Sequence, residues 1–231
     1  MSLTEEERSF IPVIEETQVF DEEEIEQALL QFKSIATPDG RIDKAGFLKV
    51  LPLLFEDPEA ERAQVIIQNQ YFLERCFGVM DEEGDGLLTM KQFAEGIVWM
   101  FSSDPSDQIK FRWKLFDVDG DGFVSPQDIF VVVQSVMLAM VRAIKQEKKA
   151  SEDEENAVWF EAAEAQVQAE LGQSKLQQII NKYFAKADTD KSGTLDYAQF
   201  ERAFLNDDDC FDWNELASEA LEAIEAEFQG A

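Results

Sequence analysis

Three segments of the 231-residue chain align without gaps, at residues 81–92, 117–128 and 188–199. Each begins with Asp and has Gly at its sixth position, an aliphatic residue at its eighth and a large apolar residue directly after its twelfth. Apolar residues also lie four positions and one position before each first Asp, which is the spacing of one face of a helix. The repeat therefore predicts helix–loop–helix units.

A loop of this design suits a calcium ion. Calcium takes about six to eight oxygen ligands, and a twelve-residue loop supplies them from positions 1, 3, 5, 7, 9 and 12. Glycine at position 6 permits a sharp backbone turn that is costly for a residue with a Cβ atom. The aliphatic residue at position 8 is expected to pair with its counterpart in a neighbouring loop as a short ribbon. In these features most of the chain resembles the EF-hand proteins.

The loop at residues 117–128 has the most complete set of predicted ligands. They are four carboxylates and the carbonyl group at the seventh position: Asp117, Asp119, Asp121, Phe123 and Asp128, with Ser125 acting through water. Asp at position 12 is one methylene shorter than the usual Glu and supplies one oxygen more easily than two. This favours six-coordinate geometry, which suits magnesium or weakly bound calcium. The predicted ion is calcium, with magnesium as the alternative.

The other two loops are predicted to be weaker metal sites because their twelfth residue is a neutral amide, Gln92 or Gln199. The remaining predicted ligands are Asp81, Glu83 and Asp85, with Thr89, in the loop at 81–92, and Asp188, Asp190, Ser192 and Asp196 in the loop at 188–199. We expect dissociation constants of about 10⁻⁴ M or weaker. For both loops, folding without any metal stays an equal alternative.

Because hands of this type form pairs, three of them predict a fourth. The segment near 33–46 keeps the apolar frame and a glycine, Gly40. If Gly40 is the sixth position, the loop starts at Ile35, which has no ligand atom. A longer loop starting near Lys33 fits the flanking apolar spacing better. We predict a degenerate, structural hand whose carboxylates are Asp39 and Asp43.

The predicted fold is all-α, with two pairs of EF-hands, the first hand degenerate, and with short inter-loop β-ribbons and extra helices. The second and third complete loops start 71 positions apart and the first and second 36 apart, which indicates an insert. Within the insert we expect an extended helix, an acidic bend near 151–155 and a helix through 158–171. The predicted parts are an acidic N-terminal segment (1–21), hand pairs at 22–102 and 107–206, the insert at about 145–174, and an acidic amphipathic C-terminal helix (207–231).

Composition narrows the function. The chain has 49 acidic and 20 basic residues and a formal net charge of −29, which argues against nucleic acid as a partner. It has no histidine, which removes His-dependent hydrolase sites and His-ligated zinc. Two cysteines and the lack of a visible secretory signal predict a cytoplasmic location. The most apolar run, 129–141, is too short for membrane insertion.

Two segments carry a closer family resemblance. Residues 101–126 (FSSDPSDQIKFRWKLFDVDGDGFVSP) and 176–193 (LQQIINKYFAKADTDKSG) are similar to calcineurin B, the plant calcineurin B-like proteins, the neuronal calcium sensors and calaxin. The resemblance implies a calcium sensor that acts as a regulatory or adaptor subunit and binds a partner helix in an apolar groove. The weak twelfth positions and the insert favour an alternative, a constitutive structural subunit of a larger assembly, for example a cytoskeletal or axonemal, dynein-associated one.

The predicted groove is lined by apolar residues at helical spacing, although ordinary core is the other interpretation for each of them: Phe93, Ile97, Val98, Phe101, Phe130, Val133, Met137 and Val141. Because the chain is acidic, the partner helix should be basic and amphipathic. The apolar stripe from Trp213 to Phe228 either folds back into this groove or docks on a partner. Both alternatives stay open.

No catalytic site is predicted, so we do not expect an enzyme. The carboxylates with organised spacing are assigned to the metal loops. Cys76 lies on the inner face of a predicted helix, where a thiol is a core residue rather than a nucleophile.

Overall fold

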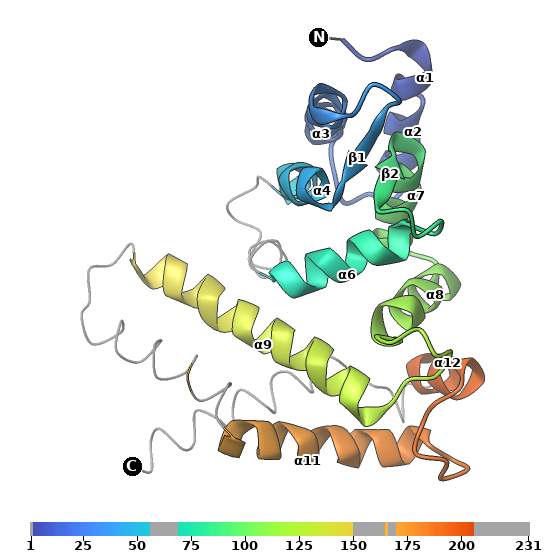
Figure 1. Ribbon diagram of the computed structural model, residues 1–231, viewed down its shortest axis with the longest axis vertical. Helices are drawn as coiled ribbons and strands as arrows, with labels where there is room; N and C mark the ends of the chain where they lie inside the picture. Colours follow the sequence, from blue (N-terminus) through green and yellow to red (C-terminus); the bar gives the residue numbers. More distant parts are fainter. Residues whose placement is uncertain (1, 56–68, 150–164, 166–169, 206–231) are drawn as a thin grey trace. The chain divides into compact units, whose positions relative to one another are not determined.

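The computed structural model describes residues 2–55, 69–149, 165 and 170–205 (Figure 1). Contacts between Cα atoms divide the chain into two compact units, Met1–Leu115 and Phe116–Ala231. In the described residues the regular structure is helical apart from one ribbon of two short strands and an isolated β-bridge. The predicted all-α fold is confirmed. No helix in these described ranges combines the length and the apolar character needed to cross a membrane.

The first unit contains two helix–loop–helix hands. The first hand consists of α3 (Glu22–Ile35), β1 (Arg41–Asp43) and α4 (Lys44–Val50), followed by the 3-10 helix η1 (Leu51–Phe55). The second hand consists of α6 (Gln70–Met80), β2 (Leu87–Thr89) and α7 (Met90–Phe101). Aromatic rings from all four α-helices meet in the core, with centroids 5.7 to 6.1 Å apart in the pairs Phe32–Phe93, Phe47–Phe77 and Phe47–Phe93. Removing this surface from water, at about 25 cal/mol per Å², holds the two hands together.

The loops of these two hands pair through β1 and β2. The strands are antiparallel, with Ile42 opposite Leu88, and both of these side chains are buried. This register makes Ile42 the eighth residue and Gly40 the sixth residue of the first hand. Gly40 has φ +80° and Gly86, the sixth residue of the next loop, has φ +79°, a left-handed conformation that glycine adopts without strain.

The prediction of a longer first loop, starting near Lys33, is wrong. Lys33 lies in the last turn of α3, which continues to Ile35. The last helical hydrogen bond is donated by the N–H of Ala36 to Phe32 O, at 3.0 Å. The helix does not continue because Pro38 disfavours helical backbone in the residue before it. The loop that follows is therefore short.

The N-terminal segment folds onto the first pair of hands. Two helices form there, α1 (Glu5–Arg8) and α2 (Phe10–Glu15). Helix α2 packs along α7, and its Ile14 side chain is 0% exposed. Just after α2, the Phe20 ring meets the Phe101 ring edge-on, with centroids 5.0 Å apart. The sequence predicted only an acidic segment at 1–21, so this cover of α7 is a finding of the structure.

Helix α8 (Pro105–Phe116) leads into loop 117–128, yet its end is attached to the first unit. The guanidinium of Arg75, on α6, donates to the backbone carbonyls of Lys114 (2.8 Å) and Leu115 (3.0 Å). Cationic groups stabilise the last carbonyls of a helix. The Lys114 ammonium in turn pairs with Glu82 at 2.7 Å. Up to Leu115, α8 thus belongs to the first unit.

The second unit contains α9 (Pro126–Lys149), α11 (Glu170–Ala187) and α12 (Tyr197–Leu205). Helices α9 and α11 lie side by side (Figure 1). The two loops of this unit pair through Val124 and Leu195, whose backbone groups exchange hydrogen bonds of 2.9 and 2.8 Å. The predicted pairing of eighth-position residues is confirmed in both units. The rings of Phe116 and Phe200 are also in contact, with centroids 6.1 Å apart.

Several predictions concern residues outside the described ranges. The acidic bend near 151–155 and the C-terminal helix at 207–231, with its apolar stripe, lie there, as does most of the predicted helix at 158–171. The extended helix at the start of the insert corresponds to α9, which continues to Lys149.

Candidate metal centre

The three aspartates at the start of loop 117–128 converge. One carboxylate oxygen from each of Asp117, Asp119 and Asp121 lies within 4.8 Å of the others. Asp117 is half-buried, and the other two are exposed. In the part of the chain that the structure describes, no other three His, Cys, Asp or Glu side chains gather so closely. Like charges at this separation repel one another, so the cluster favours a cation.

Backbone N–H groups fix the direction of these carboxylates. Asp117 Oδ2 accepts from Gly122 N at 3.1 Å, and Asp119 Oδ1 accepts from Asp121 N at 3.3 Å. Asp121 Oδ1 accepts from Phe123 N at 2.8 Å. The Oδ2 atoms of Asp119 and Asp121 accept no hydrogen bond from the described residues. The loop therefore presents oriented carboxylate oxygens before any ion binds.

Asp128, at the twelfth position, also begins helix α9. Its Oδ2 atom accepts from Ser125 N (2.8 Å) and Ser125 Oγ (2.5 Å), and its own N–H donates to Ser125 Oγ at 3.3 Å. This is a reciprocal capping box, with Ser125 as the N-cap residue. One oxygen of Asp128 is committed to the helix, which leaves the other as a single ligand atom. An all-oxygen donor set of this kind fits a hard divalent cation, calcium or magnesium.

Loop 188–199 satisfies its carboxylates with its own donors. Ser192 N donates to Asp188 Oδ1 and to Asp190 Oδ1, each at 3.0 Å. Hydrogen bonds from Ser192 first, and then from the Gln199 side chain, lower the pKa of Asp190 to about 2. Gln199 Oε1 meanwhile accepts from Asp196 N at 2.9 Å. Of the predicted ligands, Asp188, Asp190 and Ser192 are linked by hydrogen bonds, so a donor lies between the two carboxylates. Asp196 Oδ1 accepts from Gln199 N at 2.8 Å, at the start of α12.

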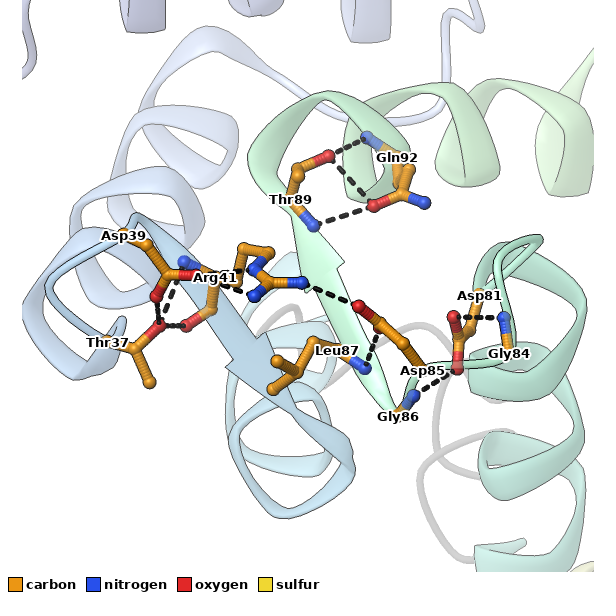
Figure 2. Close-up of polar contacts among 10 residues, drawn as sticks. All are labelled: Thr37, Asp39, Arg41, Asp81, Gly84, Asp85, Gly86, Leu87, Thr89 and Gln92. Carbon is orange, nitrogen blue, oxygen red and sulfur yellow. Dashed lines mark hydrogen bonds and ion pairs between the residues drawn. The ribbon is translucent and has the colours of Figure 1, made fainter.

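Loop 81–92 is filled in a similar way (Figure 2). Both oxygens of Asp81 accept from backbone N–H groups of the loop glycines, at 3.0 and 2.8 Å. Gln92 Oε1 accepts from Thr89 N (2.8 Å) and Thr89 Oγ1 (2.9 Å). The third predicted ligand, Glu83, is exposed. Asp81, Glu83 and Asp85 are therefore not gathered in the manner of the aspartates in loop 117–128.

A guanidinium group from the first hand reaches into loop 81–92. Asp85 Oδ2 accepts from Arg41 Nη1 at 2.6 Å, and Asp85 Oδ1 accepts from Leu87 N at 3.0 Å. Arg41 also pairs with Asp39 at 2.7 Å, which raises the pKa of Arg41. Hydrogen bonds from Thr37 and then from Arg41 lower the pKa of Asp39. Asp39 and Arg41 of the degenerate first hand therefore both take part in hydrogen bonds and ion pairs.

The twelfth side chain has a second role that the ligand pattern did not reveal. In all three complete loops an oxygen of residue 12 accepts from the backbone N–H of residue 9, at the start of the next helix. The signal was present in the sequence, because Thr, Ser or Asp followed three residues later by a side-chain acceptor is the pattern of a capping box. Helix capping and metal ligation share these side chains.

Cys76 is a free thiol that is 0% exposed, on α6. Burial raises the pKa of this thiol, because an apolar environment disfavours the thiolate. The thiolate is the reactive form of cysteine. In this position the side chain contributes to the core.

Comparison with known proteins agrees with this geometry. Residues 106–205 match the family model of the EF-hand domain pair. Calcineurin B of Schizosaccharomyces pombe is 24% identical over 184 residues, 79% of this chain and 80% of that protein. Calcineurin B of Naegleria gruberi is 24% identical over 82% of this chain and 83% of its own length.

A calcium-binding protein of Dictyostelium discoideum, NCSA, is 21% identical over 54% of this chain and 61% of that protein. The predicted resemblance to calcineurin B and related calcium-binding proteins is confirmed. Residues 106–205, which include the converging aspartates, are thus similar to an EF-hand domain pair, within a chain that is similar to calcineurin B over about four fifths of its length.

Proposed function

We propose that this protein is a calcium-binding regulatory subunit and that loop 117–128 is its principal ion site. The observation that carries the proposal is the convergence of three oriented carboxylates to within 4.8 Å, inside the segment that matches the EF-hand domain pair. The similarity to the calcineurin B proteins, which are named as subunits, supports a role within a protein complex. Catalysis by this chain is not part of the proposal.

The proposed ligands in loop 117–128 are side-chain oxygens and one backbone carbonyl: Asp117, Asp119, Asp121, Phe123 and Asp128. When bound, the ion would neutralise the clustered carboxylates and join the start of the loop to the first turn of α9. Since Asp128 offers one oxygen beside its cap, magnesium is the alternative ion. Loop 188–199 is a weaker second site in this proposal, because the Gln199 amide brings donors as well as an acceptor.

The proposed partner is a basic, amphipathic helix of another protein. The net charge of −29 favours a basic partner through long-range attraction. Of the eight residues predicted to line a groove, Phe93, Ile97, Val133, Met137 and Val141 are buried, whereas Val98, Phe101 and Phe130 are half-buried. Helix α2 already covers α7 in the first unit. Helix α11 packs against α9 in the second unit in the same way. We therefore propose that the partner binds at the part of α9 that carries the half-buried Phe130. The proposed location is the cytoplasm.

A second candidate function is a constitutive structural subunit that has lost most of its calcium response. The observation that favours it is the capping role of residues 92, 128 and 199, which keeps each helix start formed with no ion. A calcium titration followed by tryptophan fluorescence, with and without magnesium, separates the two functions. A saturable change at micromolar calcium supports the regulatory subunit, and no change supports the structural one.

Substitution of the first aspartate in each loop tests the assignment of the ion site. We expect Asp117→Ala to remove most calcium binding in isothermal titration calorimetry, because it deletes a member of the three-carboxylate cluster. Asp81→Ala and Asp188→Ala serve as matched controls, since they make the same change in loops that hold fewer converging carboxylates. Equal losses of binding in all three variants would contradict the ranking.

A further inference from the structure

The guanidinium of Arg41 places a positive charge against the fifth position of loop 81–92. In loop 117–128 the residue at that position belongs to the cluster of three carboxylates. Arg41 Nη1 lies 2.6 Å from Asp85 Oδ2, and the same guanidinium lies 2.7 Å from Asp39 Oδ2 (Figure 2). Asp85 occupies the fifth position of its loop, the position of Asp121 in the candidate metal centre. The guanidinium comes from the seventh position of the first hand.

The ribbon between the two hands determines where the guanidinium lies. Arg41 is paired with Thr89 across the β1–β2 ribbon. Its backbone carbonyl accepts from Thr37 N and Thr37 Oγ1, both at 2.8 Å, and its N–H donates to Thr37 Oγ1 at 3.2 Å. In a metal-binding hand the seventh carbonyl is a ligand. Here it closes the turn instead, and the side chain is directed to the neighbouring loop.

We propose that the Arg41 guanidinium takes the role of the metal ion in loop 81–92, so that the first pair of hands is folded without an ion and excludes divalent cations. Three of the hydrogen bonds in this loop, from Gly86 N, Leu87 N and Thr89 N, have counterparts in loop 117–128 and do not set the two loops apart. The difference is that Asp85 Oδ2 accepts from Arg41 Nη1 at 2.6 Å and Asp81 Oδ1 accepts from Gly84 N at 3.0 Å. A divalent ion at Asp85 would also meet a guanidinium at hydrogen-bond distance, where like charges repel. The proposal holds whether or not loop 117–128 binds calcium.

The glycine at the sixth position of each loop provides a reporter in the full-length protein. The N–H groups of Gly86, Gly122 and Gly193 donate to the first aspartate of their own loops, at 2.8, 3.1 and 3.0 Å. In a calcium titration followed by NMR of ¹⁵N-labelled protein, we expect no saturable shift at Gly86. Failure of the proposed function would be read separately, at Gly122.

The deciding variant is Arg41→Met, which removes the charge and keeps an unbranched side chain. We expect a saturable calcium-dependent shift to appear at Gly86, with an affinity at least about tenfold above that of the wild-type loop, because one repelling charge is gone and Asp85 is released. In EGTA the Gly84 and Gly86 amides should exchange hydrogen faster than in the wild type. Lys44→Met is the matched control, because it removes the same charge from an ion pair with Glu74 (3.4 Å) outside the loop.

Two results would overturn the proposal: a saturable shift at Gly86 in the wild-type protein, or an Arg41→Met variant in which both the calcium response and the exchange rates match the wild type. Should Arg41→Met fold only in the presence of calcium, the proposal is supported. Should it fail to fold in either condition, the double variant Arg41→Met/Asp85→Asn decides, since it removes the charge that Arg41→Met leaves unpaired in loop 81–92. A folded double variant with a silent Gly86 supports the proposal, and one whose Gly86 responds to calcium contradicts it.

Discussion

At the scale of single residues, the twelfth position of each loop has two demands placed on it. Asp128 gives one oxygen to the cap of α9 through Ser125 and has one oxygen left for an ion. Gln92 and Gln199 give their only carbonyl oxygen to the same kind of cap. The ranking of the three loops thus follows from how many oxygens remain after the helix has been capped.

Lengthening this side chain should change the choice of ion. We expect Asp128→Glu to raise calcium affinity more than magnesium affinity, because a longer carboxylate can supply two oxygens, which calcium accepts and octahedral magnesium does not. A competition titration of the two ions measures the selectivity. Asp128→Asn is the control, since it keeps the length and the cap acceptor and removes the charge. Unchanged selectivity in Asp128→Glu would show that the cap, rather than the reach of the side chain, limits ligation.

The sequence could predict which carboxylates converge in loop 117–128, but not which hydrogen bonds each oxygen accepts. The spacing of the aspartates in loop 117–128 is enough to predict their convergence. The contact of Arg41 with Asp85 was not predictable from that spacing, because it depends on the register of a ribbon between two hands. The register in turn depends on where α3 ends, and the alternative of a longer loop left that open.

At the scale of elements, helix α2 is a part of the fold that could not be predicted from the sequence pattern. It has only six residues, too few for a helical period to be recognised, and its partner α7 lies far along the chain. The capping box at Thr4 and Glu7 marks the start of α1, whereas Ser9, the N-cap residue of α2, makes no side-chain cap hydrogen bond. The hands themselves were predictable because each loop fixes the position of the helices on both sides of it.

Two neighbouring positions on α2 test how much this helix stabilises the first unit. Ile14 is 0% exposed and Val13 is 37% exposed. We expect Ile14→Ala to lower the free energy of unfolding by about 2–4 kcal/mol, through lost burial and a residual cavity. Val13→Ala, the matched control, should change it by less than about 0.5 kcal/mol. Urea unfolding in EGTA measures both, and equal effects would mean that α2 does not pack on α7 in solution.

At the scale of the whole molecule, charge is the dominant property. A net charge of −29 places the folded chain under self-repulsion, which compact states tolerate less well than expanded ones. The described ion pairs, such as Arg8–Glu26 and Lys33–Glu7, join elements of the first unit but offset only a small part of this charge. Stability should therefore depend on the ionic strength of the solution.

Raising the salt concentration from about 0.02 to about 0.3 M shortens the screening length to well below the size of the molecule. We expect the melting temperature in EGTA to rise, because screening weakens repulsion among the excess carboxylates more than it weakens close ion pairs. Sodium chloride and tetramethylammonium chloride should act alike in differential scanning fluorimetry. A rise with sodium alone would point to cation binding in the loops, and a fall with both salts would show that ion pairs dominate.

The bridge between Arg41 and Asp85 joins two hands, so neither position is expected to vary independently among relatives. A relative that loses the arginine would leave Asp85 without its partner, and the simplest repair is a Glu in place of Gln92, which would return that loop to ion dependence. A relative that loses the aspartate has no further use for the arginine. An alignment of close relatives should therefore show the two positions exchanging together, and such paired exchanges would mark the lineages in which ion dependence was lost or regained.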